Sequence, residues 1–296
     1  MKKTLVAFST LLLLTGCSQT PSAPESRTQQ SSKREPTQKI VWQEARPGLT
    51  YAEVTIDVNT TSDSSPKSSS SENPSSEQTQ TQLKDLFMVR IEPHYFLFHT
   101  YQNKDYKTAK SIKEIHEEQK AVLTFNGSFF SEDFKPVGYL KNNSQELSSI
   151  SDAEIMNGIF TIVGGRKAKL YESDESLPNK GRNITFAVQN GPILLDEKKE
   201  VRILSDTGKL ASRTALGIDQ DGNAILIILQ QNIFNADNVI TLYQFANMLK
   251  TAPVLQELGL HSVLNLDGGP STGMMIDNKY FSELDKVQNI IVVTEF

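Results

Sequence analysis

A polar turn near the end of the chain combines residue types that could do chemistry. In the stretch SVLNLDGGPSTGMM (262–275), apolar and polar residues alternate until the pattern breaks at two glycines and a proline. This predicts a buried strand that delivers polar side chains to a tight turn, where glycines allow close ligand approach and hydroxyl groups could hold a polar substrate. The residues concerned are Asn265, Asp267, Gly268, Gly269, Ser271 and Thr272. The alternative is a structural turn in which Asp267 and Ser271 cap backbone N–H groups.

Three further polar points lie at predicted strand ends or turns. They are Asn126-Gly127, Gln189-Asn190-Gly191-Pro192 and Arg213-Thr214. Each alone says little, because Asn-Gly is above all a hairpin signal. Their order and spacing along the chain are informative only together.

The elements that must position these points are mostly strands. Helices are predicted at 108–119, with Ile112 and Ile115 on one face, and at 241–258, where Pro253 could disturb the helix. Strands are predicted at 49–58, 87–90, 95–98, 121–125, 137–140, 159–163, 168–171, 184–188, 192–195, 213–218, 224–229, from 263 and at 290–294. Many strands with few helices, and no regular βαβ alternation, predict an α+β domain around a mixed, largely antiparallel sheet.

The first seventeen residues have the layout of a secretory signal. Two lysines precede an apolar run from Leu5 to Leu14, which is too short to span a bilayer comfortably, and the segment ends in LTGC. This resembles a bacterial lipoprotein signal, which implies cleavage before Cys17, lipid attachment at Cys17 and a place in the cell envelope, anchored to a membrane and facing the periplasm or the exterior. The alternative is an ordinary signal peptide with an incidental cysteine. Cys17 is the only cysteine, so the chain can form no internal disulfide.

Two low-complexity stretches frame the predicted domain. Residues 18–39 are rich in Ser, Gln, Thr and Pro and are predicted to form a disordered tether. Serine occupies nine of the fifteen positions from 62 to 76, which predicts a disordered insertion at about 60–82 within one domain spanning 40–296. The insertion could instead mark a domain boundary, but about forty residues before it would make a meagre domain.

The four polar points together resemble the phosphodiester glycosidase family, the family of the enzyme that uncovers mannose 6-phosphate by removing N-acetylglucosamine from a phosphodiester. The matching segments are FNGSFF (125–130), QNGPILL (189–195), SRTALGID (212–219) and LNLDGGPSTGM (264–274), and the last is the most specific. An opening W-x-x-A-x-P-G-L-T-Y (42–51) resembles the bacterial secreted and lipoprotein branch. The resemblance implies hydrolysis, outside the cytoplasm, of a bond between a sugar anomeric carbon and a phosphodiester oxygen.

Residue by residue, the resemblance assigns the site to a set drawn from all four segments. The set is Asn126, Gly127, Gly191, Pro192, Arg213, Thr214, Asn265, Asp267, Gly268, Gly269, Ser271 and Thr272. The chain departs from the family pattern where Ser128 replaces a second glycine and where Asp196-Glu197-Lys198 follows the Gly-Pro strand. Ser128 could narrow the turn or add a hydroxyl group to the pocket, and neither change removes an ionisable residue.

The chemistry of the leaving group can be weighed without the resemblance. Ordinary glycosidases use two carboxylates because an alkoxide leaving group needs a proton, whereas a phosphate monoester is already anionic near neutral pH. One carboxylate that activates water or stabilises an oxocarbenium-like carbon would then suffice, with a cation for the phosphate. We assign the carboxylate role to Asp267 and the cation role to Arg213. Alternatively, Asp267 is a structural hydrogen-bond acceptor in the glycine turn, and Arg213 forms an ion pair with a surface carboxylate.

The remaining features limit the partners and cofactors. A net charge of -5 supplies no basic footprint, so nucleic acid is not expected as a partner. The four histidines show no close metal-ligand spacing, and we interpret His94, His99, His116 and His261 as non-catalytic. No metal is assigned; the sequence requires no cofactor and leaves a divalent cation such as Ca²⁺ open. Expected partners are a carbohydrate or glycopolymer phosphodiester and, through the lipid anchor, a membrane.

Two hypotheses without catalysis stay open. The same pocket could bind glycan or phosphate in a non-catalytic lipoprotein of exopolysaccharide assembly, or the fold could serve only as a structural envelope protein. A fold alone does not decide activity. Exchange of Asp267 for asparagine separates catalysis from binding, because loss of turnover with binding retained would support catalysis.

Overall fold

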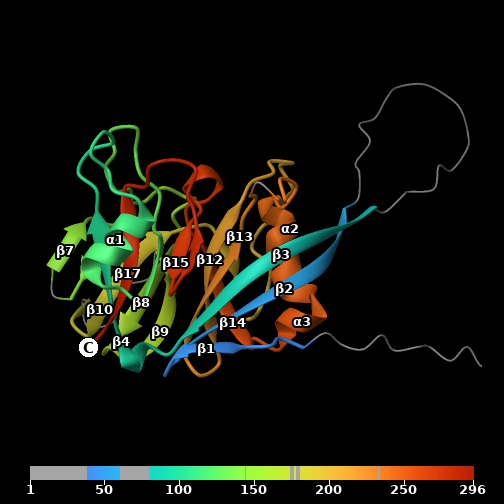
Figure 1. The fold of residues 1–296 in the computed structure, drawn as a ribbon, viewed down its shortest axis with the longest axis horizontal. Coiled ribbons are helices and arrows are strands. Elements are labelled where there is room, and N and C mark those ends of the chain that lie inside the picture. Colours follow the sequence, from blue (N-terminus) through green and yellow to red (C-terminus); the bar gives the residue numbers. More distant parts are fainter. Residues whose placement is uncertain (1–38, 61–79, 144, 174–176, 178–180, 233) are drawn as a thin grey trace, which may run out of the picture. The chain divides into compact units, whose positions relative to one another are not determined.

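The computed structural model describes residues 39–60, 80–143, 145–173, 177, 181–232 and 234–296 (Figure 1). The chain divides into two units, 1–36 and 37–296, and the first lies outside the described residues. The predictions for the signal peptide, for Cys17 and for the tether up to residue 38 therefore fall outside the described residues, as does most of the predicted insertion. At the edges of that insertion, β2 (Leu49–Thr60) extends to residue 60 and β3 (Gln80–Ile91) starts at residue 80.

Three sheets form the described part of the domain. The seven-stranded sheet has the order β1 (Gln43–Arg46), β2, β3, β13 (Ala224–Leu229), β12 (Arg213–Asp219), β14 (Leu260–Asn265) and β11 (Ile193–Leu195). One five-stranded sheet has the order β7 (Gln145–Ser148), β6 (Leu140–Asn142), β10 (Ile184–Asn190), β8 (Gly158–Val163) and β9 (Lys167–Glu172). The other has the order β16 (Lys279–Phe281), β15 (Met274–Ile276), β5 (Leu123–Asn126), β17 (Asn289–Glu295) and β4 (Phe96–Gln102).

Strands dominate this fold, and the helices are few and short. In the described residues they are α1 (Ile112–Gln119), α2 (Leu242–Thr251), α3 (Pro253–Gln256) and the 3-10 turns η1 (Pro93–Tyr95) and η3 (Gly269–Ser271). The predicted α+β class is confirmed, and the strands within each of the three sheets pair antiparallel. None of the helices in the described residues is long and apolar enough to cross a membrane.

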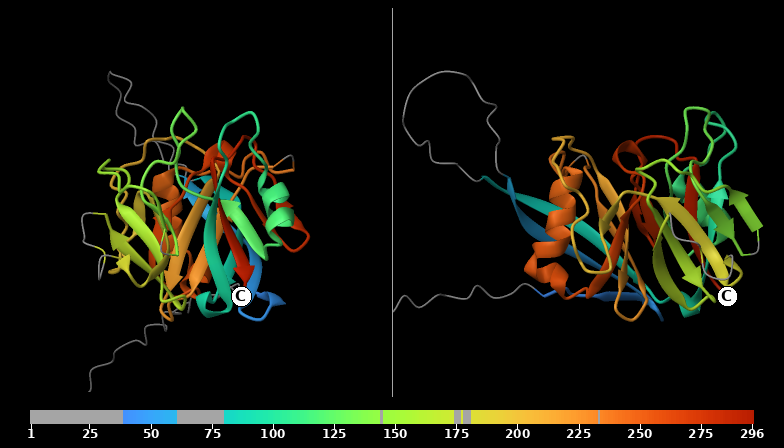
Figure 2. Two further views of the ribbon diagram at one scale, coloured as in Figure 1. Left: turned by 90° about the vertical axis from the view of Figure 1, so that its left-hand side faces the viewer. Right: turned by 180° about the vertical axis from the view of Figure 1, so that it is seen from behind.

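Strand β13 shows how the sequence builds two cores on one sheet. All six residues of AILIIL are buried, and alternate side chains point to opposite faces of a strand. Ala224, Leu226 and Ile228 join the cluster shared with the two five-stranded sheets, whereas the alternate residues of β13 join a second cluster with α2 and α3. Seen from behind, α2 lies against the hairpin of β2 and β3 (Figure 2, right).

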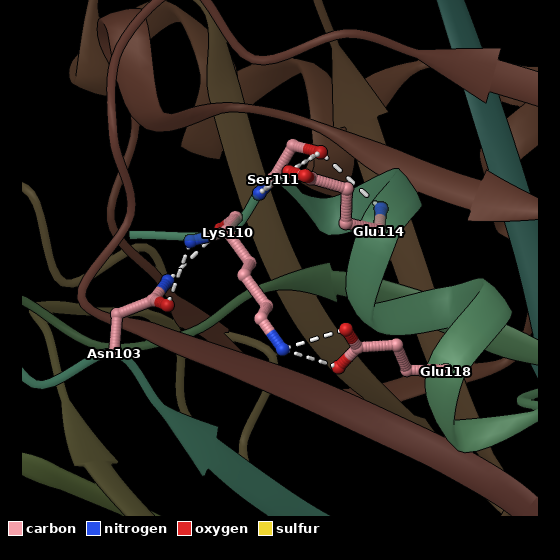
Figure 3. Close-up of polar contacts among 5 residues, drawn as sticks. All are labelled: Asn103, Lys110, Ser111, Glu114 and Glu118. Carbon is pink, nitrogen blue, oxygen red and sulfur yellow. Dashed lines mark hydrogen bonds and ion pairs between the residues drawn. The ribbon is translucent and has the colours of Figure 1, made fainter. Parts of the chain in front are cut away.

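Helix α1 begins four residues later than the pattern 108–119 predicts because Ser111 caps it. The Ser111 hydroxyl accepts a hydrogen bond from the Glu114 N–H (3.2 Å), and the Glu114 carboxylate accepts one from the Ser111 N–H (2.8 Å). The Asn103 side chain donates a hydrogen bond to the Lys110 carbonyl and accepts one from the Lys110 N–H. The Lys110 ammonium forms an ion pair with Glu118 (2.6 Å; Figure 3). These contacts fix the start of the helix that covers the sheet containing β5.

The helix predicted at 241–258 is divided at Pro253. Ala252 has extended backbone angles (φ -64°, ψ 120°), as expected of a residue before proline, and it ends α2 before α3 begins. Thr241 caps α2 by accepting a hydrogen bond from the Gln244 N–H (3.1 Å). The backbones of Ala211 and Ile240 also exchange hydrogen bonds. These bonds hold the start of α2 next to the strand end that carries Arg213.

Candidate active site

The candidate site is built where β5, β12 and β14 come together. Strand β12 pairs with β14, with Ala215 opposite Asn265, and the chain after β14 turns through Asp267 into η3. The Leu266 N–H donates to the Thr214 carbonyl (2.9 Å), and the Gly269 N–H donates to the Ser212 carbonyl (2.8 Å). The glycine turn is therefore tied to the strand end that carries Arg213.

Asn126, at the end of β5, is the side chain that joins these strands. It is fully buried, and its Nδ2 donates to the Asp267 carbonyl at 2.6 Å. Its Oδ1 accepts hydrogen bonds from the Thr214 hydroxyl (2.9 Å) and from the Gly273 N–H (3.2 Å). Both acceptor positions are thus used inside the protein. Asn126 positions the turn, and it is not among the residues that line the pocket.

Glycine is required at two of the predicted positions because neighbouring atoms fill the space. A Cβ at Gly127 would lie 1.9 Å from Asn289 Oδ1, and one at Gly191 would lie 1.9 Å from the Ile155 carbonyl oxygen. The Gly191 carbonyl in turn accepts a hydrogen bond from Asn265 Nδ2 at 2.9 Å. Both glycines therefore support the site through the backbone.

The departure at Ser128 adds no group to the pocket. Ser128 is fully buried, its N–H donates to Asn289 Oδ1 at 2.7 Å, and its hydroxyl donates to the same oxygen at 3.3 Å. Asn289 Nδ2 returns a hydrogen bond to the Ser128 carbonyl (3.0 Å). The serine that stands in place of the usual glycine therefore takes part in a buried hydrogen-bond contact with the Asn289 side chain.

Asp267 combines partial burial with few hydrogen bonds. Burial raises the pKa of its carboxyl from 3.8 to about 6, although the Ser271 hydroxyl and the Gly268 N–H, which bonds Oδ1 at 2.9 Å, favour the charged form. No cation lies within ion-pair distance of this carboxylate among the described residues. A carboxyl that titrates near neutral pH is suited to general acid–base chemistry.

Arg213 is a cation held by carbonyl groups. Its Nε donates to the Ile240 carbonyl (3.0 Å) and its Nη2 to the Lys209 carbonyl (2.8 Å), while Nη1 has no hydrogen-bond partner in the described part of the protein. Burial lowers the pKa of the guanidinium from its usual value, and the nearby Asp206 carboxylate partly offsets this effect. An arginine stays protonated under these conditions, so its charge is available to an anion.

A pocket of about 510 Å³ brings Asp267 and Arg213 together. Of the predicted site residues, it is lined by Pro192, Arg213, Asn265, Asp267, Gly268 and Gly269. The others do not line it; they are Asn126, Gly127, Gly191, Thr214, Ser271 and Thr272. Asp267 is the one carboxylate among the described lining residues, beside the two cations Lys209 and Arg213.

Asn265 has spare hydrogen-bonding capacity at the pocket wall. It is 5% exposed, and its Oδ1 has no partner, although its Nδ2 is used by Gly191. A buried polar atom without a partner is costly, so Asn265 Oδ1 is an unsatisfied acceptor in a residue of the pocket wall. Thr272 also has a buried hydroxyl oxygen without a partner, but it lies outside the pocket lining.

Sequence reasoning missed most of the pocket wall. The missed lining residues are Phe129, Ile155, Lys209, Leu210, Ala211, Ser212, Gln231, Val239, Leu242, Leu266 and Pro270. Phe129 could have been found, because it follows Asn126 and Gly127 in the FNGSFF segment. Ser212 likewise stands in the SRTALGID segment, whereas 209–211 has no comparable signal, since its place depends on the hydrogen bonds that Arg213 makes.

The four histidines lie away from the pocket lining, and no group of three metal-ligating side chains occurs among the described residues. His116 is buried, and its Nδ1 lies 3.2 Å from the Thr124 hydroxyl oxygen. Burial lowers the pKa of His116 and of His99 below 6.5. These two rings are therefore neutral at pH 7.

A family model matches more than half of the chain, and three solved structures share its fold. The family model described as phosphodiester glycosidase matches residues 119–294. A hypothetical protein from Synechocystis has a TM-score of 0.62 at 14% identity, over 88% of this chain and 64% of its own length. The catalytic domain of zebrafish N-acetylglucosamine-1-phosphodiester alpha-N-acetylglucosaminidase, auto-inhibited by its pro-peptide, has a TM-score of 0.60 at 14% identity, over 88% of this chain and 87% of its own.

A Burkholderia pseudomallei protein has a TM-score of 0.57 at 10% identity, over 86% of this chain and 96% of its own. At these identities the likeness shows the fold alone. No curated protein has a significant sequence match to the chain.

Proposed function

Because the chain belongs to the phosphodiester glycosidase family, we propose that it hydrolyses the bond between a sugar anomeric carbon and a phosphodiester oxygen. The observation that carries the proposal is a single pocket lined by a carboxylate with a pKa of about 6 and by a guanidinium that has no carboxylate partner among the described residues. The zebrafish relative is named for this type of reaction.

Asp267 acts as the carboxylate of the reaction. With a pKa of about 6, roughly nine in ten Asp267 side chains are ionised at pH 7. The ionised group can take a proton from an attacking water or stabilise positive charge at the anomeric carbon. Asn126 fixes its position through the Asp267 carbonyl, and the Gly268 N–H fixes one carboxylate oxygen.

Arg213 binds the phosphate. Two of its nitrogens are fixed by backbone carbonyls, which holds the guanidinium in one orientation and leaves Nη1 for an anionic oxygen. The leaving group is a phosphate monoester, which departs as an anion and needs no strong general acid. A lining with one carboxylate therefore fits this reaction, whereas an ordinary glycosidase needs two.

A turnover assay on the purified full-length chain tests the proposal. A panel of sugar-1-phosphodiesters is incubated with the wild type and with Asp267→Asn and Arg213→Ala, and released sugar is measured. Matched controls are Asp221→Asn, an exposed aspartate in the turn after β12, and Arg166→Ala, an exposed arginine outside this pocket. Release that is lost in the two pocket variants and kept in both controls supports the hydrolase.

The opposite result selects the binding hypothesis. If no member of the panel is cleaved, while the wild type still binds a sugar-1-phosphodiester and Arg213→Ala weakens that binding, the pocket serves recognition only.

We also propose that the protein works in the bacterial cell envelope, held to a membrane by lipid on Cys17. The support is the signal-like start of the sequence, with its apolar run ending in LTGC. Metabolic labelling with palmitate should tag the wild type and not Cys17→Ser. Equal labelling of the two proteins would refute the anchor.

A further inference from the structure

Two large apolar side chains with unusually high exposure line the pocket of Asp267 and Arg213. Ile155 is 55% exposed and Leu210 is 58% exposed, and we call these two residues the apolar rim. They come from separate segments, one before β8 and one before β12. Single exposed apolar residues are common on proteins, but two that border the same pocket as Asp267 and Arg213 indicate a binding surface.

Leu210 is placed beside the proposed phosphate clamp by the backbone. The carbonyl of Lys209, which is bonded directly to the nitrogen of Leu210, accepts a hydrogen bond from Arg213 Nη2 at 2.8 Å. The two cationic residues Lys209 and Arg213 both line the pocket. This segment therefore offers two positive charges next to an exposed apolar side chain.

Ile155 borders the same pocket from the segment before β8. Its carbonyl oxygen packs so closely on Gly191 that no Cβ would fit there, and Gly191 accepts a hydrogen bond from Asn265, which also lines the pocket. Phe129, Val239 and Leu242 are partly buried apolar residues of the same lining. The apolar rim thus continues into the pocket instead of ending at its edge.

These observations limit the chemical nature of the second group that is esterified to the phosphate of the substrate. A sugar, glycerol or other polyol would bring hydroxyl groups against side chains that can neither donate nor accept hydrogen bonds. An apolar chain attached to a phosphate matches both parts of the surface, because the cations take the phosphate and the rim takes the chain. Resting on the proposed function, we propose that the preferred substrates are sugar-1-phosphodiesters whose second ester group is an apolar chain.

The test compares two substrates that differ only in that second group. N-acetylglucosamine-1-phosphate esters of methanol and n-hexanol are assayed with the full-length chain, and the ratio of their kcat/KM values is measured. We expect the hexyl ester to be favoured at least about tenfold, or about 1.4 kcal/mol, which is well below the transfer free energy of the added methylene groups. Leu210→Ser and Ile155→Ser should each lower this ratio at least about fivefold.

Leu204→Ser is the matched control, because Leu204 is 92% exposed in the same segment and does not line the pocket. It should leave the hexyl-to-methyl ratio as in the wild type. A wild-type ratio near one overturns the proposal. So does a Leu210→Ser variant that loses the same factor with both esters, because the rim would then act by closing over any substrate.

A binding measurement separates this inference from the proposed hydrolysis. If neither ester is cleaved, n-hexyl phosphate and methyl phosphate are titrated into the full-length protein by calorimetry. Binding of the hexyl compound that is at least about tenfold tighter, and whose advantage is lost in Leu210→Ser, supports the apolar rim even though hydrolysis has failed. Equal binding of the two phosphates overturns it.

Discussion

Replacing Asp267 with asparagine should stabilise the folded protein at neutral pH while removing the proposed catalytic carboxylate. Burial raises the pKa of Asp267 from 3.8 to about 6, so the folded chain holds this proton more tightly than the unfolded chain. The difference is about 2.2 pKa units, and at about 1.36 kcal/mol per unit it corresponds to about 3 kcal/mol. The side chain of asparagine keeps an oxygen that can accept the hydrogen bond from the Gly268 N–H. Unlike aspartate, asparagine cannot ionise.

The pH dependence gives this prediction its sign. Below pH 3.8 the carboxyl is protonated in both the folded and the unfolded chain, and its burial has no ionic cost. Between pH 3.8 and about 6 the unfolded chain releases the proton and the folded chain retains it, so the free energy of unfolding of the wild type falls. Above about pH 6 the loss is complete, at up to about 3 kcal/mol relative to the asparagine variant.

Thermal unfolding of both proteins from pH 4 to pH 7.5 measures the effect. The gap in Tm between Asp267→Asn and the wild type should widen across this range, by roughly 6 °C at about 2 °C per kcal/mol for a domain of this size. The control Asp221→Asn, at an exposed turn, should follow the wild type at every pH. A gap that is constant with pH, or that narrows as pH rises, would refute the reasoning that burial dominates at Asp267.

Further predictions concern the groups around Asp267. kcat/KM for a cleaved sugar-1-phosphodiester should fall about tenfold per pH unit below about pH 6, because protonation removes the carboxylate; a profile that is flat between pH 5 and 7 argues against its role. Asn126→Ala should lower the free energy of unfolding by about 3 kcal/mol in urea titrations, since it leaves buried donors and acceptors unpaired; a loss under about 1 kcal/mol would contradict this account. Gly191→Ala should prevent soluble expression, whereas Gly165→Ala, where the space is open and only the left-handed backbone (φ +64°) is strained, should still fold with a loss of about 1 to 2 kcal/mol. Arg213→Lys should raise KM for the phosphodiester at least about tenfold, because an ammonium group cannot keep both carbonyl contacts and the phosphate; an unchanged KM would exclude Arg213 as the clamp.

The parts of the fold that follow from local pattern were predictable. The alternating cores on the two faces of β13 follow from an uninterrupted apolar run, and the break between α2 and α3 follows from Pro253. Short strands were the hardest to predict: β7 (QELS), β15 (MMI) and β16 (KYF) have three or four residues and no alternation. Such strands exist because partners from distant segments supply the pairing, as β5 does for β15.

The candidate site was likewise predictable from the sequence only in part. The sequence could indicate Asp267 and Arg213, because both stand in segments that resemble the family motifs and because a phosphate leaving group calls for one carboxylate and one cation. It could not indicate that Asn126 is used internally, since its partners come from β12 and from the turn after β14, 88 to 147 residues further along the chain. For the same reason the pocket wall at Lys209 and Leu210 had no signal of its own.

The contrast between Asn126 and Arg213 separates support from chemistry within one motif set. Asn126 is fully buried and uses both lone-pair positions of its oxygen, so removing it should damage the fold and the activity together. Arg213 keeps one nitrogen, Nη1, without a partner among the described residues, and the buried Asp267 carboxylate has no cation within ion-pair distance there. In a protein shaped only for stability, such half-satisfied charged groups would be exchanged at a gain, as the expected stabilisation by Asp267→Asn illustrates. Their retention at one pocket is therefore best explained by a ligand that supplies the missing partners.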